Sequence, residues 1–201
     1  VQGTGRHFRG FHGSLASACY AVELCCGTGG YSAELSRAGF CSLPVDHASN
    51  RHRAKVPIVR LDLALAQGRI ILDELSRDGK IFYVHAAPPC GTASQVRTKA
   101  LAATGRPAGC VDPQPLRDKD FPCGLPHLKG LDQQRGDKAN CVYRLMVEFL
   151  IRCIELGAYV SIENPTSSLM WQTPWLKLLL AMPGMLEVFF HQCMHGGERK
   201  K

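Results

Sequence analysis

Cys90 and Glu163 are the two side chains whose type and position best suit covalent chemistry in this sequence. Cys90 follows the paired prolines Pro88 and Pro89, and Glu163 follows an apolar run over Ala158–Ile162. A thiolate is a strong nucleophile, and a carboxylic acid beside it can protonate or hold the electrophile. An inert buried thiol is the alternative interpretation of the cysteine.

A strand is predicted immediately before this cysteine. The run Ile81–Val84 is short and apolar, as a buried strand is. Pro88 and Pro89 cannot donate ladder hydrogen bonds, so the strand must end before them. Cys90 is therefore expected just past the carboxyl end of a strand, which is where ligands bind in open α/β sheets.

A glycine-rich turn is predicted to hold a nucleotide-type ligand. The segment Cys26-Gly27-Thr28-Gly29-Gly30 lies between an expected strand, Tyr20–Leu24, and an expected helix, Ser32–Ala38. Glycines allow a tight turn and a close approach of the backbone to a ligand, and the helix offers free N–H groups. Strand, glycine turn and helix together predict the first unit of a nucleotide-binding α/β fold.

Two aspartates follow the next predicted strands. Asp46 ends the strand Cys41–Val45, where a carboxylate can accept hydrogen bonds from ribose hydroxyls. Its alternative role is the N-cap of a following helix. Asp62 ends a short strand over Ile58–Leu61, where its carboxylate can meet an adenine amino group.

The order of the elements predicts an α/β domain with a mostly parallel, doubly wound sheet. The remaining elements expected are helices over Leu63–Arg77, Ala139–Leu156 and Trp175–Met182, and a sixth strand over Leu186–Gln192. Residues 1–18 are expected to form a loose basic arm before a domain over 19–201. The long loop at about 91–138 is interpreted as a lid over the site, with a surface excursion as the alternative.

Composition narrows the classes of function. The chain has 201 residues, ten cysteines and a formal charge of +7. No CxxC pair occurs, and the cysteines fall within predicted strands and helices, so a reduced intracellular protein without a metal is expected. No apolar run is long enough to span a membrane. The basic balance suits a polyanionic partner or simply a solvated surface.

Several motifs resemble those of the cytosine-5 DNA methyltransferases. The residues that carry the resemblance are 23–32, 37–40, Pro88-Pro89-Cys90 with Ser94, and Glu163-Asn164. It extends over residues 20–201. It implies a Rossmann-like S-adenosylmethionine-dependent methyltransferase fold, in which the last strand and the target-recognition region are missing from this sequence.

The resemblance also implies roles for individual residues. Cys90, as a thiolate, would attack C6 of a cytosine flipped out of its stack, and Glu163 would hydrogen-bond N3 and the exocyclic amine. Arg199 would reach the cytosine carbonyl, and S-adenosylmethionine would supply the methyl group to C5. The implied cofactor-binding residues are Cys26, Gly27, Gly29, Gly30, Asp46, Asp62 and Pro88.

Other functions stay open at this level. RNA, in particular tRNA, is an alternative substrate to DNA, and Cys90 argues against an amino-methyltransferase. A catalytically degenerate fold that binds nucleic acid or protein is an alternative of another class. The family resemblance predicts a DNA-binding protein of the nucleus.

Overall fold

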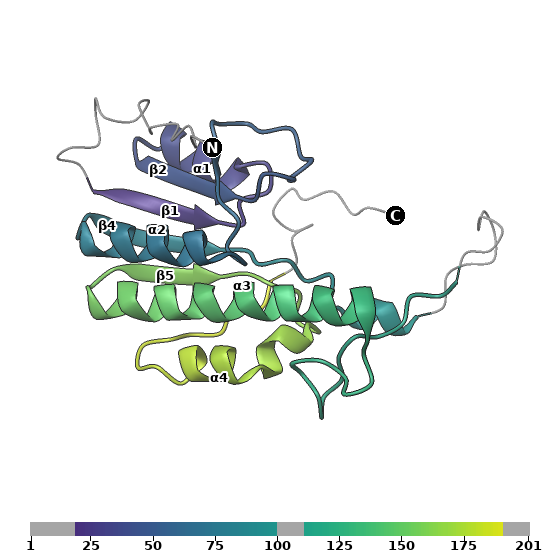
Figure 1. The fold of residues 1–201 in the computed structure, drawn as a ribbon. Helices are drawn as coiled ribbons and strands as arrows, with labels where there is room; N and C mark the ends of the chain where they lie inside the picture. The colour runs from purple at the N-terminus through teal and green to yellow at the C-terminus, as the bar shows by residue number, and fades with distance from the viewer. Residues whose placement is uncertain (1–18, 100–110, 191–201) are drawn as a thin grey trace, which may run out of the picture.

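The computed structural model describes residues 19–99 and 111–190, which form a five-stranded, all-parallel sheet in the order β3-β2-β1-β4-β5 (Figure 1). The strands are β1 (Tyr20–Leu24), β2 (Cys41–Asp46), β3 (Val59–Arg60), β4 (Ile81–Ala86) and β5 (Tyr159–Ile162). The helices are α1 (Gly30–Arg37), α2 (Ala66–Arg77), α3 (Gly130–Glu155) and α4 (Pro174–Leu180). The predicted α/β class is confirmed. The proposed arm 1–18 lies outside the described residues.

The hydrophobic core lies between the sheet and the helices α2 and α3, which cross one face of the sheet, with α4 beside α3 (Figure 1). The fully buried side chains here include Val22, Leu72, Val84, Met146 and Leu150. Successive strand residues point to opposite faces, so alternate residues of β1 and β4 supply this face. Burial of this apolar surface is the main term that stabilises the fold.

The opposite face of the sheet carries a polar row instead. His85 and Ser161 are register partners on β4 and β5, and their Nδ1 and Oγ atoms lie 2.7 Å apart. The hydroxyl of Tyr83 lies 2.5 Å from the same Oγ, and Tyr31 of α1 donates to Tyr83 over 3.1 Å. Burial lowers the pKa of His85, which leaves its imidazole neutral at pH 7. These partly buried polar groups thus satisfy one another's hydrogen-bonding capacity.

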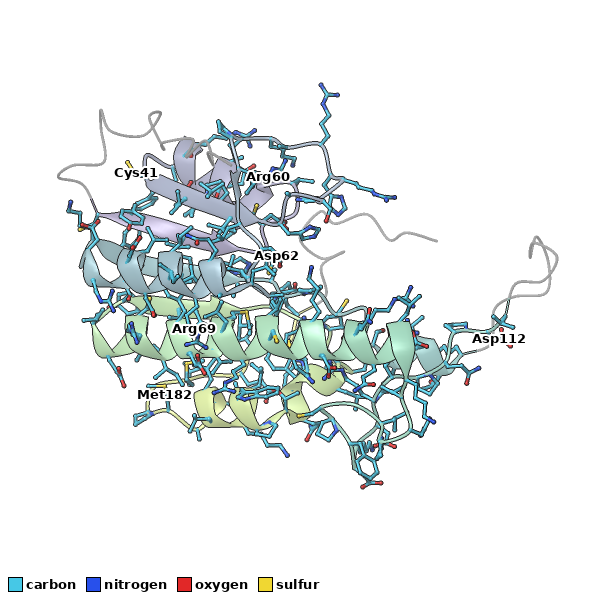
Figure 2. The ribbon with its side chains drawn as sticks, in the orientation of Figure 1. Cys41, Arg60, Asp62, Arg69, Asp112 and Met182 are labelled. Carbon is cyan, nitrogen blue, oxygen red and sulfur yellow. The ribbon has the colours of Figure 1, made fainter. Side chains whose placement is uncertain are left out.

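Ion pairs join α2 to α3 at the surface. Arg69 pairs with Glu148 over 2.5 Å, and Arg152 pairs with Asp73 over 2.9 Å. Figure 2 labels Arg69 where α2 faces α3. These side chains are between a third and a half exposed, so each pair contributes at most about 1 kcal/mol. The apolar core, rather than charge, holds the two helices together.

α3 begins at Gly130, nine residues before the predicted start at Ala139, which shortens the predicted loop to 91–129. The extra turns contain two glycines and little apolar periodicity, so pattern alone did not reveal them. Tertiary contacts hold them: Lys138 pairs with Asp62 over 2.8 Å, and Arg117 donates to the carbonyl of Gly136 over 3.1 Å. Tertiary contacts here override a weak local signal.

The predicted sixth strand over Leu186–Gln192 is wrong in its described part, because residues 186–190 form no strand. Leu186 is 85% exposed and Val188 is 75% exposed. An apolar run becomes a strand only when it pairs with another, and this one has no strand partner in the described chain. None of the described helices has the length and apolar character needed to cross a bilayer.

Two neighbouring leucines of α4 test how the core is built. Leu176 is fully buried, whereas Leu178 is 61% exposed. We expect Leu176→Ala to lower the free energy of unfolding by about 2–5 kcal/mol, because it leaves a cavity. Leu178→Ala should change it by less than about 0.5 kcal/mol. Urea denaturation measures both, and equal losses would contradict this packing of α4.

Candidate active site

The glycine turn after β1 is fixed by backbone hydrogen bonds. The N–H of Cys26 donates to the carbonyl of Val45 over 3.1 Å, and the N–H of Gly29 donates to the carbonyl of Cys26 over 2.8 Å. Gly27 and Gly29 have backbone φ angles of 57° and 69°, which residues other than glycine rarely adopt. The sequence therefore needs glycine at both positions to turn from β1 into α1.

The carboxylate of Asp46, at the end of β2, ties this turn to the next strand. It accepts from the N–H of Gly27 over 2.7 Å, from the N–H of His47 over 2.7 Å and from the amide of Asn50 over 2.9 Å. No helix begins between β2 and β3, so the alternative role as a helix N-cap is wrong. Three donors leave about one of the four acceptor positions of this carboxylate open.

The loop over residues 47–58, which we call the strap, folds back over the glycine turn. Asn50 donates to the carbonyl of Gly27 over 2.5 Å, and the N–H of Lys55 donates to the carbonyl of Thr28 over 2.8 Å. A Cβ on Gly29 would lie 2.7 Å from Cγ2 of Val56, which is too close for real atoms. The strap and the turn are thus packed as one unit.

Asp62 lies in the segment between β3 and α2 (Figure 2). Its carboxylate accepts from the ammonium of Lys138 over 2.8 Å and from the N–H of Ala64 over 3.0 Å. Burial alone would raise the pKa of Asp62, but these hydrogen bonds and the charge of Lys138 outweigh it and lower that pKa. The carboxylate is therefore held ionised at neutral pH.

The segment that carries Cys90 is held on two sides. The amide of Asn164 donates to the carbonyl of Pro88 over 2.8 Å, and the hydroxyl of Tyr143 donates to the carbonyl of Pro89 over 2.6 Å. Tyr143 is fully buried, and burial raises its pKa, so its hydroxyl stays a donor.

Glu163 leaves the sheet beside this segment. Its N–H donates to the carbonyl of Ala86 over 2.9 Å, which continues the pairing of β5 with β4. Cys90 and Glu163 are both half-buried, on segments that run side by side. The amide oxygen of Asn164 is buried without a hydrogen-bond partner among the described residues, which leaves an acceptor beside the Cys90 segment.

Arg117 anchors the chain between 111 and 129 to α3. Its side chain is 1% exposed and donates to Asn140 over 2.7 Å and to the carbonyls of Pro122 and Gly136 over 2.8 and 3.1 Å. Its guanidinium also lies 5.5 Å from the ring centre of Tyr143. Burial lowers the pKa of Arg117, and the ring and carbonyl dipoles stabilise the remaining charge. The anchor therefore contacts the same tyrosine that holds the Cys90 segment.

A cavity of about 500 Å³ opens between these elements. Gly27, Asp46 and Asp62 are among its lining residues. Pro89 and Thr92, which flank Cys90 closely, line the cavity too. The strap and the first turns of α3 supply the remaining polar lining, which comprises His47, Ser49, Asn50, Arg51, His52, Arg135 and Lys138. The glycine turn and the cysteine segment thus share one cavity.

The sequence-predicted residues divide into two groups around this cavity. Gly27, Asp46 and Asp62 line it. The others that the structure describes lie in the segments around it without lining it: Cys26, Gly29, Gly30, Pro88, Cys90 and Glu163. Arg199 lies outside the described residues. Of the described residues 91–99 and 111–129, Thr92 alone lines the cavity, so the lid stays a prediction.

Sequence reasoning missed several residues of the site. Asn50 and Tyr143 act through contacts 23 and 54 positions away, which no local pattern reveals. Cys25 also lines the cavity, and its pKa is raised to about 12, first by burial and then by the charge of Asp46. Its thiol therefore stays protonated at neutral pH and lines the cavity as an unreactive group. The basic run 51–55 was the visible signal for the strap.

The size and lining of the cavity suit a small-molecule ligand of the nucleotide type. Its volume lies within the range of about 300–1,000 Å³ that is usual for small-molecule sites. A Cβ on Gly27 would meet nothing within 4 Å, so the backbone of the turn is open to a ligand. Asp46 and Asp62 offer carboxylates to ribose and adenine, and Arg51 offers a cation to a carboxylate.

A matched pair of glycines tests the packing of the strap. Gly29 and Gly79 have φ angles of 69° and 67°, but only a Cβ on Gly29 would meet another residue within 4 Å. We expect Gly79→Ala to cost about 1–2 kcal/mol of stability through backbone strain alone. Gly29→Ala should cost more, and adding Val56→Ala should recover part of the difference. Equal thermal shifts for the two single variants would contradict the contact.

Removal of one hydroxyl tests how the Cys90 segment is held. We expect Tyr143→Phe to lower the free energy of unfolding by about 0.5–1.5 kcal/mol, because the carbonyl of Pro89 loses its donor. Hydrogen exchange of the Ala93 amide, which donates to the carbonyl of Cys90 over 2.9 Å, should accelerate. Tyr159→Phe, at a residue 80% exposed, is the control and should change neither. Unchanged exchange in Tyr143→Phe would contradict this role.

Comparison with known proteins gives no relative on which to base a function. No protein-family model matches the chain, and neither curated proteins nor solved structures yield a match. The case for a function therefore rests on the residues of the site and on the motifs of the sequence.

Proposed function

We propose that this chain is a cytosine-5 methyltransferase domain that transfers a methyl group from S-adenosylmethionine to a cytosine in DNA. One observation carries the proposal: a single cavity is lined both by the glycine turn, Asp46 and Asp62 and by the neighbours of Cys90. A methyl donor bound to the first group of residues would share this cavity with a base bound near Cys90. Transfer between two bound groups requires such proximity.

The residues on the cofactor side would each take one part of S-adenosylmethionine. The open backbone at Gly27 would lie against the methionine portion. Asp46 would accept from the ribose through its remaining acceptor position, and ionised Asp62 would accept from the adenine amino group. Bound there, the cofactor supplies an electrophilic methyl group on its sulfonium.

Cys90 and Glu163 would act on the base. The thiolate of Cys90 would form a bond to C6, and the C5–C6 π electrons would move to C5, which becomes nucleophilic and takes the methyl group. Glu163 would hydrogen-bond N3 and the exocyclic amine and so stabilise the charge that develops on the ring. Loss of the C5 proton to water or another base would then expel the thiolate and restore the double bond.

A trapping experiment tests the chemistry. Fluorine at C5 cannot leave as a proton does, so a 5-fluorocytosine oligonucleotide with S-adenosylmethionine should yield a lasting covalent adduct. We expect the adduct with the unaltered chain and with Cys141→Ser, which removes an exposed thiol of α3. Cys90→Ser should form none, yet should bind S-adenosylmethionine with unchanged heat in calorimetry.

The outcomes separate the alternatives. An adduct with RNA but not with DNA would move the proposal to the RNA branch. No adduct with either, or an equal adduct in Cys90→Ser, would overturn the enzymatic function. Absence of cofactor heat as well would favour a degenerate fold that serves as an interaction module.

A further inference from the structure

The strap carries a concentration of positive charge that the fold does not neutralise. Arg51, His52, Arg53 and Lys55 are all exposed, and no acidic residue lies between His47 and Ile58. The side chains of the two arginines and the lysine make no ion pair with any carboxylate in residues 19–99 and 111–190. Like charges this close repel one another, so an anionic partner would relieve them.

Other cations near the cavity differ from these. Lys138 pairs with Asp62 over 2.8 Å, and Arg135 pairs with Asp132 over 3.0 Å. Their charges are already matched by Asp132 of α3 and by Asp62 in the segment after β3. The strap is therefore the part of the described cavity wall where cationic side chains are left without internal partners.

The strap is also held in place before any ligand arrives. Its backbone is tied by Asn50 to Gly27, by Lys55 to Thr28 and by Val56 packed under Gly29. A prearranged loop loses little conformational entropy when it binds. Three fixed contacts on one short loop are more than a merely solvated loop requires.

The position of the strap relates its charge to the cysteine. It leaves the carboxyl end of β2, at the same sheet edge from which Cys90 and Glu163 emerge. Arg51 and His52 line the cavity that Pro89 also lines. Arg53 and Lys55 do not line the cavity, so they carry the same charge onto the surface beside it.

We propose that the strap binds the phosphate backbone of the nucleic-acid strand whose base enters the cavity, with Arg53 and Lys55 as phosphate contacts. The inference rests on the nucleic-acid substrate of the proposed function and names the surface that holds it. Such contacts position the strand without reading its sequence. Each neutralised phosphate releases counterions, which makes the contact measurable through salt.

The test compares two double variants of equal charge. The strap variant is Arg53→Gln with Lys55→Gln. The control variant is Arg37→Gln with Arg77→Gln, which removes two cations from the last turns of α1 and α2, near the amino ends of the strands and away from the strap. Affinity for a labelled cytosine-containing DNA duplex is measured over a range of salt concentrations. In the strap variant, the negative slope of log K against log salt should become shallower by about 1.8. Its affinity at about 0.1 M salt should fall by roughly tenfold to a hundredfold. The control pair should leave the slope unchanged.

Three results would overturn the inference. They are an unaltered slope in the strap variant, an equal change in the control pair, and no duplex binding by the unaltered chain. Displacement of the duplex by inorganic phosphate at equal concentration would assign the strap to a small anion instead.

Cofactor calorimetry and adduct trapping, run on the same variants, separate this inference from the proposed function. A reduced slope without cofactor heat or adduct would keep the strap as a nucleic-acid surface and reject the methyl transfer. Adduct formation with an unaltered slope would keep the methyl transfer and reject the strap as a phosphate-binding surface.

Discussion

Two successive prolines at the end of β4 impose the constraint on which the site depends. Without an N–H, neither proline can donate a ladder hydrogen bond, so the strand ends before them. Their carbonyls therefore need hydrogen-bond donors from outside the sheet ladder. The segment after β5 supplies the amide of Asn164 to one carbonyl, and α3 supplies the hydroxyl of Tyr143 to the other. The Cys90 segment is thereby fixed to two separate elements. A cysteine on an unrestrained loop would lack a defined position relative to Glu163, and covalent catalysis requires that position.

The second half of the site depends on one carboxylate. Asp46 joins the glycine turn, the end of β2 and the strap through three short hydrogen bonds. Because the strap also packs on Gly29, a ligand that binds Asp46 contacts a unit that includes the basic loop. Cofactor and nucleic acid would then meet two sides of one rigid assembly.

Local patterns in the sequence predicted the parts of the fold that local chemistry determines. The apolar runs of β1 and β4, the glycine turn and the paired prolines lie where expected, because each follows from short-range rules. The first turns of α3 escaped prediction, since the partners that hold them, Asp62 and Arg117, are distant in sequence. The apolar run at 186–190 was wrongly predicted to be a strand, because apolar character without a strand to pair with does not make a strand. The placement of Cys90 and Glu163 just past neighbouring strands could be predicted, because parallel strands end at one edge. The long-range contacts of Asn50 and Tyr143 could not.

β5 ends the order of the sheet, and within the described residues it has a strand neighbour on one side only. Its outer row of N–H and C=O groups is a template for another extended backbone. Tyr159, the first residue of this strand, is 80% exposed, and Leu186 and Val188 are also largely exposed to water. Purified material should accordingly be prone to self-association as its concentration rises. Arginine or mild chaotropes in the buffer, or a charged substitution at Tyr159, are the practical remedies for keeping it in solution.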